Sequence, residues 1–301
     1  MLIEKQNTFE TMNMSHITPD VISVDSFQKL SRIVYRESGI YLGNEKRMML
    51  SSRLSKRLRA TGCPTYEAYI EYLVTSEHAS DELISMVDVV TTNKTEFFRE
   101  KHHFEYLADT LLPKLEKQYA FHPGSPLRVW SAGCSTGQEP YTLSFVLSEF
   151  FQGDTTKYRI LATDLSTRVL REAREGIYLE SNLEGIPKLI RLKYMHRGGG
   201  NWSEYRRVIP EIRRTVIFGK LNLMDDSYGI KERFHVIFHR NVMIYFDRQT
   251  RKVVVQKLWE HLVDNGHLFI GHSERLDPDC DNFILEAQTV YRKQSASLGE
   301  S

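Results

Sequence analysis

From about residue 91 onward, the chain alternates short strand-like runs with helix-like segments. The strand-like runs are LRVWSA (127–132), YRILATD (158–164), TVIFGKL (215–221), FHVIFHR (234–240) and HLFIGHS (267–273). Helical spacing predicts helices near 100–119, 139–151, 166–175 and 249–264. This alternation is typical of an α/β domain with a mostly parallel central sheet. A final run, FILEAQTVYR (283–292), predicts a closing antiparallel hairpin.

Residues 21–90 show a different pattern and are expected to form a separate helical domain. Apolar residues recur at helical spacing around Phe27, Leu54 and Tyr69, and the breaker cluster at 61–64 ends the second of these helices. A length of 301 residues is ordinary for two domains. We therefore predict a helical domain at 21–90 and an α/β domain at 91–294, with mobile tails at 1–20 and 295–301.

Charge and cysteine content exclude several classes of protein. The formal net charge is +1, so no global field favours nucleic acid or a membrane surface. The start of the chain has no apolar signal segment, and no apolar run approaches the length of a membrane span. Cys63, Cys134 and Cys280 are far apart and form no CxxC pair, which argues against disulfides and against a metal site. We expect a cytoplasmic protein without a bound metal.

One segment interrupts the α/β alternation. Residues 192–210 carry three consecutive glycines between short extended runs. We interpret the region at about 190–212 as a small β-subdomain inserted into the α/β domain.

The turn after the first strand-like run is a candidate ligand site. In VWSAGCSTGQEPYTL (129–143), glycines at 133 and 137 would let the backbone approach a ligand closely. Their spacing is not GxGxxG, and Glu139 begins the next helix, where a pyrophosphate would be repelled. S-adenosylmethionine (SAM) carries an ammonium and a sulfonium instead, which favours SAM over a dinucleotide. Alternatively, Glu139 only stabilises the helix dipole.

Polar residues follow the later strands at the same predicted edge of the sheet. Asp164 ends the second run, where a carboxylate can accept both hydroxyls of a ribose or simply form a turn. Asn222 follows the third run, and Arg240, Asn241 and Tyr245 follow the fourth. The carboxyl ends of parallel strands are where ligands bind in such folds.

A further candidate lies at the junction of the two domains, in TTNKTEFFRE (91–100). Asn93 and Glu96 have the spacing of a capping box, which predicts a helix start with Phe97 and Phe98 packed inward. Arg99 would then lie on the first turn of that helix. It could be a surface residue, but a guanidinium there is also suited to grip a carboxylate.

The segment NEKRMMLSSRLSKRLRA (44–60) is strongly basic. Helical spacing places Lys46, Arg53 and Arg57 on one face, with Lys56 beside it. Such a run is often only a solvated face. The alternative is a positive surface that orients an acidic protein partner.

Taken in order, six motifs resemble the chemotaxis receptor methyltransferases of the CheR family. They are TTNKTEFFRE, SAGCSTGQEPYTL, ATD (162–164), LNL (221–223), FHRNVMIYF (238–246) and GHLFIGHSE (266–274). The resemblance spans residues 23–292. It implies a helical N-terminal domain that docks on the receptor, a Rossmann-like SAM-binding sheet and an inserted β-subdomain. The SAM contacts that it implies are Asn93, Thr95, Arg99, Glu139, Asp164, Asn222, Leu223, Arg240 and Asn241.

The resemblance also implies an activity and partners. The chain would transfer a methyl group from SAM to glutamates on the cytoplasmic helical bundle of chemoreceptors, with Arg99 and Tyr245 as catalytic residues and S-adenosylhomocysteine as product. The basic helix, including Arg59, would contact the receptor, and the protein would be a monomer that binds no nucleic acid. The loop with Arg197, Gly198 and Gly200 resembles one that binds a receptor C-terminal pentapeptide in some members, although a ligand-free hairpin connection remains an alternative. Two other readings stay open: methylation of RNA or a small molecule, and a SAM-sensing module without turnover.

Overall fold

The computed structural model describes residues 21–91, 95–280 and 282–294, which divide into two compact units. One unit contains residues 21–33 and 42–90, and the other contains residues 34–41 and the described residues from 91 onward. The predicted tails, 1–20 and 295–301, lie outside the described residues. Within the described residues, no helix is long and apolar enough to cross a membrane.

The regular structure of the first unit is helical, as the sequence pattern predicted. Its helices are α1 (Val24–Ser38, whose last residues group with the second unit), α2 (Arg47–Thr61), α3 (Tyr66–Thr75) and α4 (Ala79–Val90). The apolar stripe of α2 points inward, so Leu50 and Leu54 are fully buried, together with Tyr69 of α3 and Met86 of α4. Thr65 caps α3 by accepting the Ala68 backbone N–H at 3.2 Å.

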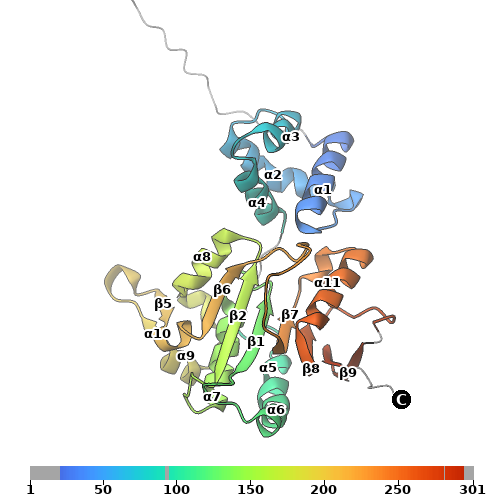
Figure 1. Cartoon of the computed structure of the whole chain (residues 1–301). Coiled ribbons are helices and arrows are strands. Elements are labelled where there is room, and N and C mark those ends of the chain that lie inside the picture. Colours follow the sequence, from blue (N-terminus) through green and yellow to red (C-terminus); the bar gives the residue numbers. More distant parts are fainter. Residues whose placement is uncertain (1–20, 92–94, 281, 295–301) are drawn as a thin grey trace, which may run out of the picture. The chain divides into compact units, whose positions relative to one another are not determined.

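The second unit is built on a seven-stranded sheet in the order β6-β2-β1-β7-β8-β10-β9 (Figure 1). Its strands are β1 (Leu127–Ala132), β2 (Tyr158–Asp164), β6 (Val216–Lys220), β7 (Phe234–His239), β8 (Leu262–Ile270), β9 (Phe283–Ala287) and β10 (Val290–Lys293). The pairs from β6 to β8 are parallel, and β10 is antiparallel to both β8 and β9. Every residue of β7 is buried, which explains its nearly continuous apolar sequence. The predicted mostly parallel sheet and closing hairpin are confirmed.

The crossovers leave the centre of this sheet in opposite directions. The chain passes from β1 through α7 (Gln138–Phe150) to β2 on one side, and from β7 through α11 (Arg248–Glu260) to β8 on the other. Because such crossovers are right-handed, α7 and α11 cover opposite faces of the sheet. A third crossover helix, α8 (Thr167–Glu175), contacts β2 and β6. The two neighbours β1 and β7 therefore form a topological switch point, the place where sheets of this class bind ligands.

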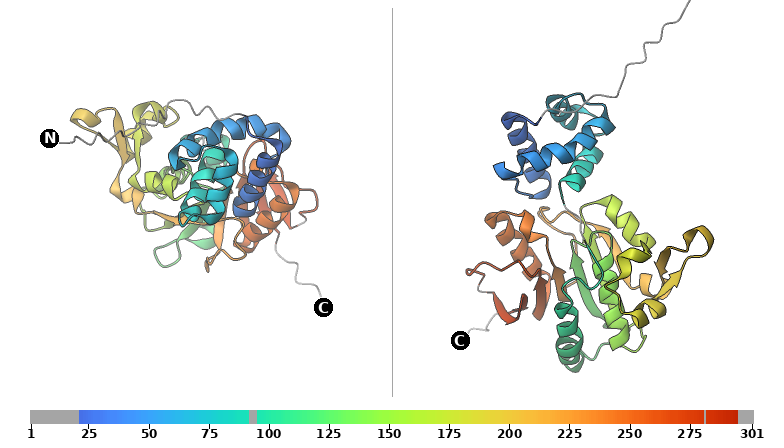
Figure 2. Two further views of the ribbon diagram at one scale, coloured as in Figure 1. Left: turned by 90° about the horizontal axis from the view of Figure 1, so that it is seen from above. Right: turned by 180° about the vertical axis from the view of Figure 1, so that it is seen from behind.

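An antiparallel three-stranded sheet is inserted between α8 and β6. Its strands are β3 (Ile177–Leu179), β4 (Met195–Arg197) and β5 (Tyr205–Val208), in the order β3-β5-β4, with α9 (Lys188–Tyr194) and α10 (Pro210–Arg213) beside them. Figures 1 and 2 show it beyond the β6 edge of the large sheet, on the side away from β9. The insertion was predicted at about 190–212, whereas β3 begins at residue 177. Three residues are too few to show an alternating pattern.

Candidate functional site

The turn after β1 brings bare backbone to the carboxyl edge of the sheet. Gly133 has φ = 96°, and a Cβ added there would lie 2.6 Å from Val242 Cγ2. Gly137 has φ = 94°, and its added Cβ would lie 2.9 Å from both Ala173 Cβ and the Tyr178 hydroxyl. Only glycine fits either position without strain. The turn can therefore pass close to α8 on one side and leave its backbone open to a ligand on the other.

Glu139 lies at the start of α7, directly after this turn. Ser131 Oγ donates to its Oε1 at 2.7 Å, and Arg240 Nη1 lies 3.6 Å from its Oε2. The Glu139 side chain is 16% exposed. Burial raises the pKa of this carboxyl, and the charges of Arg240 and Arg99 oppose that rise. A cation bound at the open side of Glu139 would stabilise its ionised form.

Arg240, which follows β7, is the central cation of the site. Its side chain is 2% exposed, and its guanidinium lies 5.3 Å from the centre of the Phe104 ring. Nη2 donates to the Arg99 carbonyl and lies 3.4 Å from Glu100 Oε2. Its Nε and Nη1 are buried and have no hydrogen-bond partner. Because buried donors are normally paired, these atoms point to a ligand at this edge.

Glu100 completes this charged cluster, and sequence reasoning assigned it no role. Burial opposes its ionisation, but the charge of Arg240 and other interactions hold the pKa of the carboxyl below its ordinary value. Asn241 donates from Nδ2 to Glu100 Oε1 at 3.2 Å. The sequence-predicted Arg240, Asn241 and Glu139 are thus brought together, with Glu100 linking the segment before α5 (His102–Tyr106) to the end of β7.

Asp164 ends β2, next to the glycine turn. Its Oδ2 accepts the Ser135 backbone N–H at 2.8 Å, and its Oδ1 accepts that of Ser166 at 3.0 Å. These bonds fix the carboxylate against the turn after β1. The carboxylate is therefore positioned at the carboxyl end of β2, where folds of this class bind a ribose.

Glu274 holds the loop that carries the site residues, although the sequence analysis gave it no role. The residue is only 5% exposed. Its Oε2 accepts the backbone N–H groups of Asn241 at 2.9 Å and Gly271 at 2.6 Å, and its Oε1 accepts that of Ile244 at 3.3 Å. One carboxylate therefore binds the ends of both β7 and β8. The GHSE sequence, already part of the family pattern, was the signal for this residue.

The segment around Arg99 differs from its prediction. The helix begins at His102, not near residue 96, so Arg99 is not on a first helical turn. The reason lies in the backbone: Phe98 has φ = 55° and Glu100 has φ = 56°, which no helix accommodates. Phe97 is buried and Phe98 half-buried, so the expected inward packing holds. Thr95 is half-buried, and Asn93 lies outside the described residues.

The remaining predicted residues of this edge have structural bonds of their own. Asn222 donates from Nδ2 to the Glu37 carbonyl at 2.7 Å, and its Oδ1 accepts the Met224 N–H at 3.0 Å. Tyr245 ends the short helix Met243–Tyr245 and is half-buried, as is Leu223. The Asn222 side chain therefore fixes the 222–224 turn, a role that the sequence did not indicate.

Two arginines of the basic helix bind within the helical unit. Arg57 donates from Nε to Glu82 Oε1 at 2.9 Å and from Nη2 to Glu82 Oε2, and Tyr69 also donates to this carboxylate. Arg53 donates to the Val90 carbonyl. Lys46 is half-buried, and Lys56 and Arg59 are exposed. The basic face thus contains a structural ion pair as well as exposed charge.

The glycine loop of the insertion forms a closed hairpin. The Gly198 N–H donates to the Tyr205 carbonyl at 2.9 Å, and Arg197 Nε donates to the Ser203 carbonyl at 3.4 Å. A short helix from Gly200 to Trp202 ends in an exposed tryptophan. β4, which leads into this loop, is an edge strand of the small sheet.

The donor set fits SAM. Glu139 offers a carboxylate for an ammonium, Asp164 offers one for ribose hydroxyls, and the turn after β1 contains glycine at 133 and 137. Arg240 adds buried donors that could bind a carboxylate. Among the described residues, no group of three or more His, Cys, Asp or Glu side chains could hold a metal ion.

Comparisons with known proteins agree with this geometry. Residues 93–292 match the model described as the CheR methyltransferase SAM-binding domain, and residues 25–91 match the CheR methyltransferase all-alpha domain. The chemotaxis protein methyltransferase of Borreliella burgdorferi is 40% identical over 257 residues, which cover 85% of this chain and 89% of that protein. The chemotaxis protein methyltransferase of Escherichia coli is 37% identical over 265 residues, which cover 88% of this chain and 89% of that protein. The chain therefore belongs to the CheR family and is a SAM-dependent chemotaxis methyltransferase.

Proposed function

We propose that the chain methylates glutamate side chains on the cytoplasmic helical bundle of chemoreceptors and forms glutamate methyl esters. The observation that carries this proposal is the position of Arg99. Its backbone carbonyl accepts from Arg240 Nη2, and Arg240 Nη1 lies 3.6 Å from Glu139, so Arg99 belongs to the segment at the cofactor-binding edge. A carboxylate acceptor would find its counter-charge there.

The chemistry of a glutamate acceptor suits this arrangement. A glutamate carboxyl has an ordinary pKa near ~4.3, so it is ionised at neutral pH and needs no general base. Bound SAM supplies the electrophilic methyl group. The residues of the chain align the acceptor and exclude water, and alignment alone can contribute about 7–11 kcal/mol. Arg99 holds one acceptor oxygen, and Tyr245 orients the group.

Charge on the helical unit supports receptor docking through α2. Lys56 and Arg59 are exposed and face outward, whereas Arg57 is engaged with Glu82. An acidic helical bundle would be oriented by the exposed pair. Replacing Lys56 and Arg59 by glutamate should raise the receptor KM at low salt and leave SAM affinity unchanged. Arg32→Glu, an exposed change on α1, is the control, and an equal effect of that change would remove α2 from the interface.

A second contact with the receptor is proposed at the inserted sheet. The edge strand β4 could pair with an extended C-terminal pentapeptide, with Arg197 near an acidic residue and the exposed Trp202 beside it. Titration of the full chain with such peptides should shift the backbone resonances of β4 and Gly200. If the peptides leave these resonances unmoved, the hairpin is only a connection.

The methyl ester itself gives the decisive assay. The chain is incubated with methyl-labelled SAM and a receptor cytoplasmic fragment, and alkali should release the label as volatile methanol. N-methyl groups and RNA ribose methyl groups are stable to this treatment, and a SAM-sensing module would transfer no label.

The substitution Arg99→Ala tests the acceptor-binding residue. It should raise the activation barrier of methyl transfer by about 2.7–4 kcal/mol and so lower the turnover rate. A normal rate in this variant would exclude Arg99 as the acceptor-binding residue. Sedimentation of the same preparation tests whether the chain is a monomer.

A further inference from the structure

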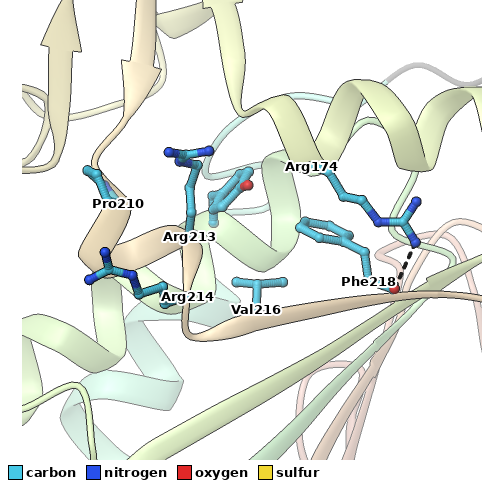
Figure 3. Close-up of a pocket in the computed structure, with 7 residues that line it drawn as sticks. Arg174, Pro210, Arg213, Arg214, Val216 and Phe218 are labelled. Atoms are coloured by element: carbon cyan, nitrogen blue, oxygen red, sulfur yellow. Dashed lines mark hydrogen bonds between the residues drawn. The ribbon is translucent and has the colours of Figure 1, made fainter.

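A second cavity lies in the α/β unit, separate from the SAM site. It has a volume of about 390 Å³ and is lined by Tyr141, Arg174, Arg213, Arg214 and Phe218, among others. Figure 3 shows Arg213 between Arg214 at one end and the Arg174–Phe218 pair at the other. Arg213 ends α10, Arg214 follows it, and Arg174 lies in the last turn of α8. None of these residues belongs to the cofactor edge described above.

The three guanidiniums lack acidic partners. Within the described part of the chain, none of them forms an ion pair, although Arg174 donates from Nη2 to the Phe218 carbonyl at 2.9 Å. The Arg213 Nε is buried and has no hydrogen-bond partner. Two other arginines of the same unit do have an acidic partner: Arg191 and Arg206 both form ion pairs with Glu180, at 3.0 and 2.5 Å. The charge around the cavity is therefore left uncompensated.

Uncompensated charge of one sign costs free energy, because the cations repel each other and a buried donor is left unpaired. The chain as a whole has a net charge of only +1, so this excess is local and not part of a general basic surface. A bound anion would remove both costs. Guanidinium groups match the geometry of phosphate oxygens and bind them bidentately.

The rest of the lining is apolar and consists of Pro210, Val216 and the rings of Tyr141 and Phe218. Tyr141 and Phe218 lie edge to face with their ring centres 5.9 Å apart. Tyr141 is fully buried and its hydroxyl donates to the Ala173 carbonyl at 2.8 Å, so the half-buried Phe218 ring that packs against it is the aromatic surface a ligand can reach. Aromatic faces next to arginines suit a planar group such as a nucleobase. The cavity volume is within the range of about 300–1,000 Å³ that is typical of small-molecule sites.

We propose that this cavity binds an organic phosphate of the size of a mononucleotide. Arg213 and Arg214 hold the phosphate together with Arg174, and the Phe218 ring, supported by the buried Tyr141, contacts the base. The site would respond to a phosphorylated metabolite and is separate from the SAM site, so both ligands can be bound at once.

The test uses the full chain saturated with S-adenosylhomocysteine, so that no nucleotide can enter the cofactor site. GMP, AMP, guanosine and inorganic phosphate are titrated by calorimetry. We expect at least one mononucleotide to bind, inorganic phosphate to compete with it, and guanosine to bind much more weakly. Raising the salt concentration should weaken the binding, because the contacts are ionic.

Two variants and one control locate the site. Arg213→Ala and the exposed Arg214→Ala should each weaken nucleotide binding by about tenfold or more, which corresponds to the loss of a charge-assisted hydrogen bond. Arg233→Ala, an exposed arginine before β7, which lies three strands away from β6 in the sheet, should change nothing. Because Arg214 is exposed, its variant tests the site even if Arg213→Ala is unstable. The proposal is overturned if no mononucleotide binds at millimolar concentration, if guanosine binds as tightly as GMP, or if the Arg214 variant binds normally.

Discussion

Glu274 offers the sharpest test of how the SAM site is held together. Its carboxylate accepts three backbone N–H groups, and two of them, those of Asn241 and Ile244, belong to the loop after β7. The same loop contains Arg240 and Tyr245, the predicted cofactor and acceptor contacts. Asn241 itself has φ = 59°, so the loop has an unusual backbone conformation that the carboxylate stabilises. Replacing this carboxylate should therefore loosen the site without touching any ligand.

The substitution Glu274→Gln keeps the size of the side chain and removes its charge. A hydrogen bond to a charged group contributes about 1.5–3 kcal/mol and a neutral one about 0.5–1.5 kcal/mol, so the two bonds to Oε2 lose ~1 kcal/mol each. The amide nitrogen must then replace the oxygen at the 3.3 Å bond to Ile244, where it opposes another donor. We expect a total loss of about 2–4 kcal/mol in the free energy of unfolding.

Urea unfolding measures that loss, and calorimetry measures SAM affinity in the same variant. SAM binding should weaken, because part of its binding energy must now order the 240–245 loop. Glu172→Gln is the matched control: this carboxylate pairs with Arg168 on α8, is 51% exposed, and should change stability by less than ~0.5 kcal/mol. If Glu274→Gln unfolds at the wild-type urea concentration and binds SAM normally, the carboxylate does not hold the loop and our reasoning fails.

Three further changes test other parts of the structure. Asp164→Ala should weaken SAM binding by about 1–3 kcal/mol in calorimetry, and an unchanged affinity would remove Asp164 from the site. Arg57→Ala should lower the free energy of unfolding by about 3 kcal/mol, because it leaves the buried Glu82 carboxylate without its cation. An unfolding midpoint at the same urea concentration as the wild type would contradict this. Burial is the main reason that the pKa of His103 is lowered to about 3 and that of His235 to about 4, so both are neutral in the folded protein. The unfolded chain takes up these protons as the pH falls below about 6.5, so stability should fall by about 2 kcal/mol per histidine by about pH 5, and NMR titration of either ring at an ordinary midpoint would refute the assignment.

The central sheet was predictable from sequence because its strands are buried on both faces. β1 and β2 have the bounds that the sequence runs indicated, since most of their residues are buried and apolar, although Arg159 is exposed. The positions of Glu139, Asp164 and Arg240 followed from the rule that ligands bind at the carboxyl ends of parallel strands. Local pattern and topology were sufficient for these features.

Features that depend on distant contacts were not predictable. The pair of Arg57 and Glu82 joins residues 25 positions apart, and Asn222 binds the carbonyl of residue 37, so neither bond leaves a local sequence signal. The late start of α5 depends on left-handed backbone at Phe98 and Glu100, residue types that give no warning of it. The individual helix at 79–90 was also missed, because its boundaries lacked the breaker residues that marked the end of α2.

The one-sided arrangement of the sheet has a practical consequence for engineering. The turns that form the SAM site leave the carboxyl ends of β1, β2 and β7, so the opposite edge of the unit is free of them. The connections at 120–126 and 151–157 precede β1 and β2 at that opposite edge. Surface connections of this kind accept inserted sequence well when they are remote from function. An epitope or a fluorescent probe inserted at 152–156 could therefore report where the enzyme is found in a living cell while methyl transfer continues undisturbed.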